Sequence, residues 1–381
     1  MSVIRIKAST EYDVNIERGL LDSAGRLIAE ALGKKQAAAA IKTECACGTE
    51  ADKKQEEQGA LGTAAVIADD TVFALYGSRV CDSLCKAGFR VVSFTFAPGE
   101  QSKSLATYEK ILYFLAENHI TRSDFLVALG GGITGDITGF AAATYLRGVR
   151  FVQIPTTLLA AVDSSVGGKT AINLGTGKNQ VGSFYQPTLV ICDPDTLKTL
   201  PEDEYLCGCA EVIKYGILGN EPFFRSLKKT HIKEQEENVI ETCVAMKSNI
   251  VADDEFDRGK RQLLNLGHTI GHAVEAASDF AVLHGQAVAI GMAVIARAAA
   301  AKGFCTAETR DEIIEILNMY GLPSAADFPL ADMYSAALAD KKVSGKKINL
   351  IVPQRIGECI IETTDCLLYT SCRHFLQDLQ I

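Results

Sequence analysis

Residues 124–136 read DFLVALGGGITGD and join two different patterns. The segment 124–129, which is apolar after Asp124, predicts a buried strand that leads directly into Gly130, Gly131 and Gly132. Helical spacing follows at 137–146. Glycines let a backbone approach a ligand closely and helix N-terminal N–H groups favour an anion, so this turn suits a pyrophosphate. An ordinary tight strand–helix turn stays open as an explanation.

The flanking segments alternate between strand and helix patterns. Further strands are predicted at 64–68, 90–96 and 151–155, and a helix is predicted at 107–118. This alternation predicts an α/β domain with a largely parallel sheet. Beyond residue 204 helical spacing dominates, at 210–218, 239–250, 263–277, 286–302 and 309–320, with a late β pair at 347–352 and 358–362. We therefore expect an α/β domain at 1–200 and a mostly helical domain at 201–381.

Composition narrows the class of protein. The 381 residues are 48% hydrophobic and 22% charged, with 47 acidic against 38 basic residues and a net charge of −9. This balance is typical of a folded chain and argues against a general nucleic-acid binder, which needs a basic face. The longest apolar stretch, 287–301, contains Arg297, so we expect no membrane span. The polar, charged segment 44–62 is expected to be a surface insertion.

Targeting and cysteine patterns favour the cytoplasm. Arg5 and Lys7 interrupt the first ten residues and no apolar core follows, so we expect no signal peptide. The twelve cysteines are scattered and form no paired C-x-x-C motif of a zinc site. In such a chain reduced thiols are expected rather than disulfides.

The segment 153–183 is rich in hydroxyl, glycine and lysine side chains. Gly168-Lys169-Thr170 resembles the end of a phosphate loop, but that motif would need a glycine where Asp163 stands, so we reject a nucleoside triphosphatase. A loop that also carries Lys178 and Asn179 suits a phosphorylated small molecule, although a merely solvated loop has the same composition.

Three of the six histidines cluster in the second half, at His268, His272 and His284. His268 and His272 are four residues apart, which places both on one face of a helix. Glu211 lies in an apolar helical segment, where a carboxylate needs a partner. Two histidines and one glutamate would leave a zinc ion an open position, as catalytic sites require. Spacing does not decide which two histidines bind, and satisfied core histidines are the structural alternative.

Charged and amide side chains surround these positions in the sequence. Lys214, Lys247, Arg261 and Asn265 lie close to the possible metal ligands, and Lys346 belongs to a lysine-rich turn. Each of them, taken singly, could simply be solvated.

Several long motifs resemble those of the 3-dehydroquinate synthase family. They are GGGITGDITGF at 130–140, DSSVGGKTAINLGTGKNQVGSF at 163–184, GCAEVIKYG at 208–216, LLNLGHTIGHAVEA at 263–276 and LHGQAVAIGM at 283–292. The resemblance runs in the family's order over residues 64–357.

The resemblance implies a Rossmann-like, NAD-binding domain at 1–200 and a helical domain at 201–381 that binds metal and substrate. It implies tightly held NAD and one divalent ion, Zn²⁺ or Co²⁺. The expected enzyme is a phosphate-eliminating lyase of the shikimate pathway, which leads to chorismate and the aromatic amino acids. We expect a cytoplasmic homodimer that acts on a small sugar phosphate, with no nucleic-acid or membrane partner.

The implied reaction converts 3-deoxy-D-arabino-heptulosonate 7-phosphate to 3-dehydroquinate and phosphate. Transient oxidation at carbon 5 by NAD acidifies the proton at carbon 6, and phosphate then leaves carbon 7. Hydride returns, the ring opens and an intramolecular aldol step closes the carbocycle. The substrate's own phosphate can serve as the base.

The resemblance also assigns residues by their matching positions. It selects Glu211, His268 and His284 as the metal ligands, and His272 becomes a substrate-side residue. The implied cofactor-binding residues are Asp69, Glu100, Lys103, Gly131, Gly132, Asp136, Thr156, Thr157, Leu159, Thr199, Leu200 and Glu204. The implied catalytic and substrate-binding residues are Asp163, Lys169, Lys178, Asn179, Lys214, Lys247, Arg261, Asn265 and His272, with Arg147 and Lys346 on the phosphate side. Arg147 is placed where it could act across a dimer interface.

Three alternatives belong to other classes. Sibling sugar-phosphate cyclases use substrates such as glucose 6-phosphate, which lack the carboxylate that Arg261 and Asn265 would bind. Metal-dependent glycerol dehydrogenases share the fold and would accumulate NADH. A non-catalytic binding protein would not need the complete set of one glutamate and two histidines.

Overall fold

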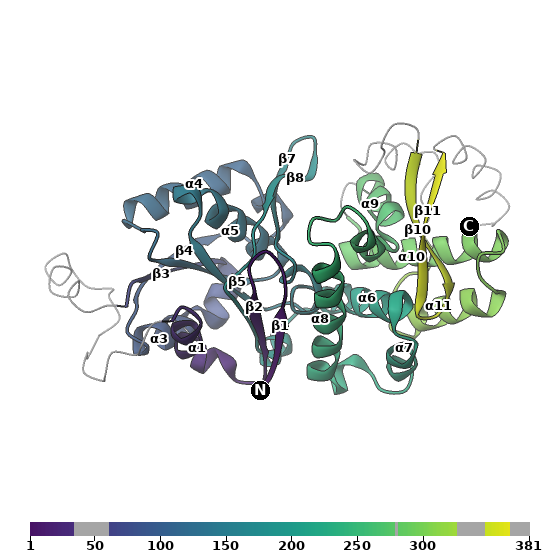
Figure 1. The fold of residues 1–381 in the computed structure, drawn as a ribbon, viewed down its shortest axis with the longest axis horizontal. Helices are drawn as coiled ribbons and strands as arrows, with labels where there is room; N and C mark the ends of the chain where they lie inside the picture. The colour runs from purple at the N-terminus through teal and green to yellow at the C-terminus, as the bar shows by residue number, and fades with distance from the viewer. Residues whose placement is uncertain (34–60, 279–280, 326–346, 366–381) are drawn as a thin grey trace, which may run out of the picture. The chain divides into compact units, whose positions relative to one another are not determined.

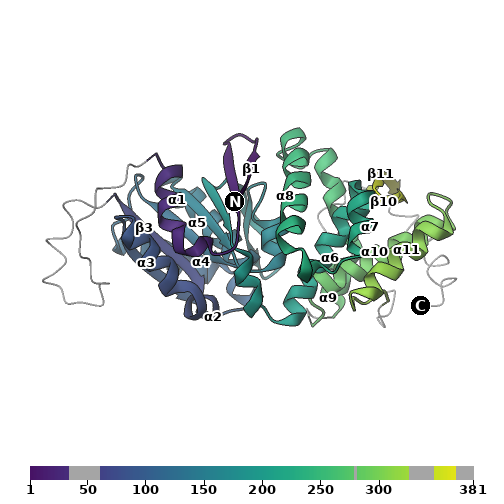
Figure 2. The same cartoon turned by 90° about the horizontal axis from the view of Figure 1, so that it is seen from below.

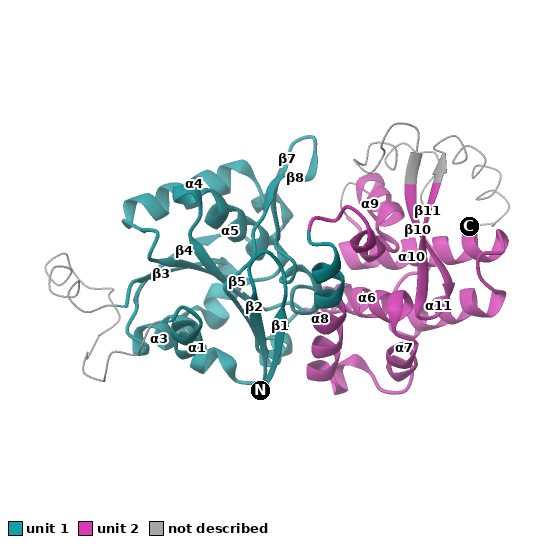
Figure 3. Cartoon of the chain, viewed as in Figure 1, with its two compact units in different colours: residues 1–200, 247–255 teal, residues 201–246, 256–381 magenta. Residues whose placement is uncertain are grey.

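The computed structural model describes residues 1–33, 61–278, 281–325 and 347–365. Its contacts divide the chain into two compact units. Unit 1 comprises residues 1–200 and 247–255, and unit 2 comprises residues 201–246 and 256–381 (Figure 3). Residues 247–255, which the sequence placed in the helical domain, therefore pack with unit 1. The segment predicted as an insertion at 44–62 lies outside the described residues apart from Leu61 and Gly62.

Unit 1 is built on a seven-stranded sheet in the order β1-β2-β9-β6-β5-β3-β4. β1 and β2 are antiparallel, whereas the other neighbouring strands are parallel. The strands are β1 (Ser2–Ile6), β2 (Tyr12–Ile16), β3 (Thr63–Asp69), β4 (Arg90–Phe96), β5 (Phe125–Gly130), β6 (Arg150–Pro155) and β9 (Leu189–Cys192). The predicted α/β fold with a mostly parallel sheet is confirmed.

Helices cover both faces of this sheet. In Figure 1, α1 (Ala24–Ala31) and α3 (Ser78–Lys86) lie below it, and α4 (Leu105–Glu117) and α5 (Gly132–Thr144) lie above it. Figure 2, the view from below, brings α1 and α3 to the front.

The covered faces explain why the strands read as continuous apolar runs. Val66, Val127 and Val152 contribute to one buried cluster, while their neighbours Ile67 and Leu126 contribute to the cluster on the opposite face. Alternate side chains of a strand point to opposite faces, so both sets must be apolar when helices cover both sides.

The segment that the sequence indicated as a loop at 153–183 is mostly ordered structure. A short helix, η6 (Ala160–Ser164), precedes an antiparallel hairpin of β7 (Lys169–Leu174) and β8 (Gly177–Phe184). Gly167 and Gly168 have φ values of 93° and 68°, and this left-handed backbone turns the chain into the hairpin. The loop expectation was wrong because the strands carry many lysines, amides and glycines, and these obscure their alternating burial.

The remaining elements of unit 1 are short. They are η1 (Leu20–Ser23), α2 (Asp70–Val72), η3 (Phe73–Gly77), η4 (Glu100–Ser102), η5 (Tyr145–Arg147) and η7 (Pro194–Thr199). Unit 1 also includes the end of α8 (Glu236–Asp253), and Figure 3 shows the change of unit within this helix.

Unit 2 is mostly helical, as the sequence predicted. Its elements are α6 (Glu202–Gly219), α7 (Glu221–Leu227), η8 (Ile232–Glu234), the first part of α8, η9 (Lys260–Asn265), α9 (His268–Ala277), α10 (His284–Ala301), α11 (Ala307–Met319), β10 (Lys347–Arg355) and β11 (Glu358–Asp365). The sequence predicted a single helix at 263–277. This prediction was wrong in one respect, because the helix is interrupted between η9 and α9. Gly267 has a φ of 78°, which ends the first helical segment and starts the second.

Glycines let α6, α9 and α10 pack with their backbones close together. A Cβ on Gly271 of α9 would lie 3.1 Å from the backbone of Ala287 in α10, and a Cβ on Gly285 of α10 would overlap the backbone of Cys207 in α6. These approaches bring the N-terminal ends of α9 and α10 next to α6.

One described helix, α10, is long and apolar enough to cross a membrane, with a mean hydropathy of 1.2. In this structure 67% of that window is buried, and α10 packs against α6, α9 and α11. Its apolar character is explained by its central position in unit 2.

Candidate functional site

The first part of the site lies where the strand order of unit 1 reverses. From β3 the chain continues to β4 on one side, and it then returns to β5 on the other side of β3. Ligands of open α/β sheets bind outside the carboxyl ends of strands at such a switch point. Asp69 ends β3 and Gly130 ends β5, so both occupy this edge.

The glycine turn after β5 has no room for side chains. A Cβ on Gly131 would lie 2.9 Å from Thr157 Cγ2, and one on Gly132 would lie 3.1 Å from Ser164 Oγ and 3.8 Å from Leu159. The structure thus brings together Gly131, Gly132, Thr157 and Leu159. The backbone N–H of Thr156 donates to Gly130 O at 3.0 Å and fixes the next loop beside the turn.

The helix after this turn starts earlier than the sequence predicted. α5 begins at Gly132 rather than at residue 137, so its first turn is made from the glycine run itself. The free N–H groups of that first turn are a suitable cradle for a pyrophosphate.

A polar network joins five of the predicted residues. Lys103 is only 5% exposed, and its Nζ donates to Asp136 Oδ2 and to Asn179 Oδ1, both at 2.5 Å. Burial raises the pKa of Asp136, and the opposing charge of Lys103 only partly offsets this effect. Lys178 Nζ lies 4.0 Å from Glu100 Oε1.

Asn173 links the two ends of this network, and sequence reasoning missed it. Its Nδ2 donates to Glu100 Oε1 at 2.7 Å, while its Oδ1 accepts from the backbone N–H of Asn179 at 2.8 Å. Asn179 has a φ of 52°, a left-handed conformation that this hydrogen bond supports. An asparagine within a polar hairpin gives no sequence signal for such a role.

A second ion pair in unit 1 combines two predicted residues from distant segments. Lys247, near the end of α8, pairs with Asp163 Oδ1 and also donates to Asp163 O at 2.7 Å. Lys247 is 6% exposed. Lys169 is exposed on β7.

Other predicted residues of unit 1 lie apart from these clusters. Thr199 Oγ1 is 2.5 Å from Tyr76 Oη, and Leu200 follows it. Arg147 is exposed with a φ of 65°, and within the described part of the chain no predicted site side chain forms an ion pair with it.

Unit 2 gathers the possible metal ligands. One ligand atom each from Glu211, His268 and His284 lies within 4.8 Å of the other two. His268 Nε2 and His284 Nε2 are both 3.5 Å from Glu211 Oε1. A carboxylate oxygen and two imidazole nitrogens form a donor set that Zn²⁺ or Co²⁺ accepts.

The buried carboxylate of Glu211 is suited to binding a cation. It is 1% exposed, and Lys214 Nζ lies 2.5 Å from its Oε2, yet this oxygen has no hydrogen bond of good geometry within the described structure. An incompletely satisfied buried carboxylate is expensive, and a bound divalent ion would compensate for it.

His284 faces two carboxylates. Its Nδ1 is 3.3 Å from Glu275 Oε2, on the opposite side of the ring from Glu211. Burial disfavours the charged ring, but hydrogen bonds to Glu211 and Glu275 outweigh it and raise the pKa of His284 to about 9. A metal ion would therefore displace a proton when it binds.

Sequence reasoning also missed Glu275. The sequence could have indicated it, because Glu275 is a carboxylate in an apolar helix, and the same feature identified Glu211. A second group of possible ligand atoms, from His272, Glu275 and His284, also lies within 4.8 Å. His272 thus belongs to the cluster, with its ring centroid 5.7 Å from that of His268.

The other predicted residues of unit 2 are placed as follows. Arg261 is 1% exposed in η9, and Asn265 is half-buried at the end of the same element. Glu204 is exposed in the first turn of α6. Lys346 lies outside the described residues.

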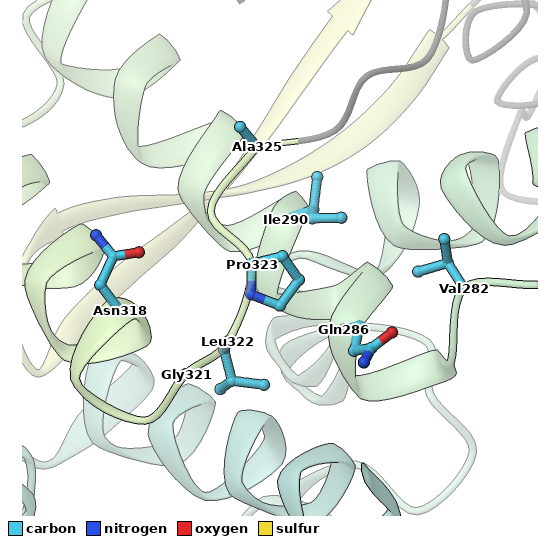
Figure 4. Close-up of a pocket in the computed structure, with 8 residues that line it drawn as sticks. All are labelled: Val282, Gln286, Ile290, Asn318, Gly321, Leu322, Pro323 and Ala325. Atoms are coloured by element: carbon cyan, nitrogen blue, oxygen red, sulfur yellow. The ribbon is translucent and has the colours of Figure 1, made fainter.

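Unit 2 also contains a groove. It has a volume of about 540 Å³ and is lined mainly by Val282, Ile290, Leu322 and Pro323, with Gln286 and Asn318 at its sides (Figure 4). None of the described lining residues is a predicted site residue.

Comparison with known proteins adds evidence from sequence. A family model described as 3-dehydroquinate synthase N-terminal matches residues 93–207, and the C-terminal model of the same enzyme matches residues 208–343. A 3-dehydroquinate synthase of Streptococcus suis (strain 05ZYH33) is 41% identical over 360 residues, which cover 93% of this chain and 94% of that protein.

Solved structures add evidence from fold. 2-Deoxy-scyllo-inosose synthase, in complex with carbaglucose-6-phosphate, NAD⁺ and Co²⁺, has a TM-score of 0.80 with 23% identity and covers 97% of this chain and 99% of that chain. 2-epi-5-epi-Valiolone synthase from Streptomyces hygroscopicus subsp. jinggangensis 5008, with NAD⁺ and Zn²⁺, has a TM-score of 0.78 with 23% identity and covers 98% of this chain and 100% of that chain. At this identity the likeness shows a shared fold.

Proposed function

Because the chain belongs to the 3-dehydroquinate synthase family, we propose that it converts 3-deoxy-D-arabino-heptulosonate 7-phosphate to 3-dehydroquinate and phosphate. The observation that carries the proposal is the Glu211, His268 and His284 cluster in a chain that the family models match over residues 93–343. The reaction would make the protein a phosphate-eliminating lyase of the shikimate pathway.

NAD is the proposed cofactor of unit 1. The glycine turn at Gly131 and Gly132 and the first turn of α5 would hold its pyrophosphate, and Asp69 at the neighbouring strand end would hold its adenosine side. Bound NAD would accept a hydride from the substrate and return it, so no net NADH would accumulate. Glu100, Lys103 and Asp136 would fix its position through the network described above.

The proposed metal is Zn²⁺ or Co²⁺, held by Glu211, His268 and His284. A divalent ion there would lower the pKa of substrate hydroxyl groups. Lys214 would balance the charge of Glu211, to which it already lies close.

Positive and amide side chains are proposed to bind the substrate. Lys169, Lys178 and Asn179 are on the β7–β8 hairpin, and Arg261 and Asn265 are on η9. The buried guanidinium of Arg261 favours a substrate with a carboxylate. Arg147 and Lys346 are proposed on the phosphate side, and Arg147 is proposed to act across the interface of a homodimer.

Proton handling is proposed for Asp163, Glu211 and His272. The Lys247 ammonium stabilises the Asp163 carboxylate, and so fixes its orientation. We also propose that Thr156, Thr157, Leu159, Thr199, Leu200 and Glu204 contact the cofactor, and that the enzyme works in the cytoplasm.

The test is phosphate release from 3-deoxy-D-arabino-heptulosonate 7-phosphate with NAD, measured before and after chelation while NADH is monitored. Chelator-sensitive release without NADH supports the proposal. Release from glucose 6-phosphate instead would indicate a sibling cyclase, and net NADH from a polyol would indicate a dehydrogenase. Either result would overturn the assignment.

A further inference from the structure

Both possible histidine ligands have a partner behind the ring. His268 Nδ1 lies 3.1 Å from the backbone oxygen of Leu266, and His284 Nδ1 lies 3.3 Å from Glu275 Oε2. In both rings the other nitrogen, Nε2, faces Glu211 Oε1 at 3.5 Å. The two imidazoles are therefore arranged alike, with Nδ1 toward an acceptor and Nε2 toward the carboxylate that would share the metal.

This arrangement determines which ring nitrogen carries the proton. A neutral imidazole holds one N–H, and an acceptor at Nδ1 keeps the proton on that nitrogen. The lone pair is then on Nε2, where a metal would bind. For His268 the acceptor is a neutral carbonyl, whereas for His284 it is a carboxylate, which also makes the ring a stronger donor to the metal.

Glu275 is positioned firmly enough for this task. It is 3% exposed and lies on α9, the helix that also carries His268 and His272. α9 packs against α10 through the close approach of Gly271 to Ala287, which fixes the start of α10 and therefore His284. A buried carboxylate costs free energy unless it is paired, and the Nδ1–H of His284 provides a partner.

We propose that Glu275 is a positioning residue that orients His284 and strengthens its bond to the metal. The inference rests on the proposed metal centre and adds a residue that is not itself a metal ligand. Nδ1–H donates to Glu275 Oε2, and Nε2 stays available to the ion beside Glu211. Outer carboxylates of this kind typically change metal affinity by about 10–100-fold.

The grouping of His272, Glu275 and His284 suggests a competing arrangement. In it Glu275 would bind a second ion through its own oxygen, and His284 would use Nδ1 as a ligand. The hydrogen-bond distance between Glu275 and His284 Nδ1 favours the first arrangement, and the number of metal ions per chain separates the two.

The experiment compares the wild-type chain with Glu275→Gln and Glu275→Ala. Glu275→Gln keeps the shape and one acceptor but removes the charge, and it decides the question if Glu275→Ala does not fold. Glu236→Gln is the matched control, since Glu236 is also buried in unit 2, where it accepts from Tyr205 Oη at 3.2 Å. The measurements are Zn²⁺ affinity by chelator competition, zinc per chain, and the visible spectrum of Co²⁺-loaded protein.

We expect the Kd for Zn²⁺ to rise about 10-fold in Glu275→Gln and up to about 100-fold in Glu275→Ala. The Co²⁺ bands should shift in Glu275→Ala and stay unchanged in the control. Affinities of both variants within twofold of the control would overturn the proposal. Two zinc ions per wild-type chain, with one lost in Glu275→Ala, would overturn it in favour of the second arrangement.

These outcomes separate the inference from the proposed function. A wild-type chain that binds no metal would contradict the proposed metal centre and the role of Glu275 together. A wild-type chain that binds one zinc ion and releases phosphate, with Glu275 variants of unchanged affinity, would contradict only the inference.

Discussion

Glu211 is surrounded by side chains that together make a site for a divalent cation. It is 1% exposed within α6, with Lys214 Nζ at 2.5 Å from one oxygen and two imidazole nitrogens at 3.5 Å from the other. Such a group is costly to bury unless its partners complete its coordination. A buried carboxylate beside two imidazole nitrogens therefore favours a metal centre.

Removal of one ligand should abolish metal binding and turnover together. We expect His268→Ala to lose its zinc and its phosphate release, because a carboxylate and a single imidazole hold the ion too weakly. Zinc per chain and phosphate release check this result. His119→Asn is the control, since His119 is exposed with a φ of 57° and asparagine tolerates that conformation. One zinc ion per chain retained in His268→Ala would show that the ligand assignment is wrong.

Two cysteines of unit 2, the buried Cys207 and the half-buried Cys359, should react slowly with thiol reagents. Burial raises the pKa of Cys207 to about 11 and that of Cys359 to about 12. A higher thiol pKa means less thiolate, so at pH 8 only about a thousandth of Cys207 would be in the reactive form. Mass spectrometry after alkylation of native protein should find both residues unmodified, and urea should expose them. Rapid native modification of Cys207 would contradict the buried position of the residue.

At the scale of elements, the β7–β8 hairpin depends on one asparagine. Asn173 connects Glu100 to the backbone of Asn179 through two hydrogen bonds. We expect Asn173→Ala to lower kcat/KM by about 10–30-fold, because each lost bond contributes about 1 kcal/mol. Steady-state kinetics with varied substrate and varied NAD measure the effect.

A variant at the hairpin tip provides the comparison for Asn173. Thr176 makes a local hydrogen bond to Gln180 Oε1 at 2.6 Å and is exposed, so Thr176→Ala should leave kcat/KM nearly unchanged. Equal effects of the two variants would show that Asn173 has no special role.

Elements with one dominant pattern could be predicted from sequence, whereas elements set by packing could not. β3 and β5 read as continuous apolar runs because helices cover both of their faces. The β7–β8 hairpin was missed because polar side chains obscure its alternation, and the break at Gly267 was missed because the apolar spacing continues through it. Strands β1 and β2 were missed as well, since each is short and mixes charged with apolar residues.

The choice of metal ligands likewise depends on packing, which the sequence pattern does not show. Helical spacing placed His268 and His272 on one face but did not choose between them. The choice depends on how α6, α9 and α10 pack, and that depends on close backbone contacts at Gly271 and Gly285. In the structure His268 and His284 face Glu211, while His272 groups with Glu275. The ligand assignment itself stays a prediction.

At the scale of the whole molecule, the two units should respond separately to their proposed ligands. The metal ligands all belong to unit 2, on α6, α9 and α10, whereas the glycine turn and Asp69 belong to unit 1. A ligand that binds only the folded state stabilises it by about 4 kcal/mol at a thousand times its Kd. Most of that gain in the free energy of unfolding should apply to the unit that contains the ligating residues.

Chelation should therefore loosen unit 2 selectively. We expect amide hydrogen exchange to accelerate in α6, α9 and α10 after the metal is removed, by up to about a thousandfold where exchange requires that unit to unfold. Exchange in β3, β5 and β6 should stay nearly unchanged, because their hydrogen bonds belong to the sheet of unit 1. Removal of NAD should give the opposite pattern, with faster exchange at the start of α5. Equal acceleration in both units after chelation would mean that they unfold as one cooperative body, and the metal would then stabilise the whole chain rather than its own unit.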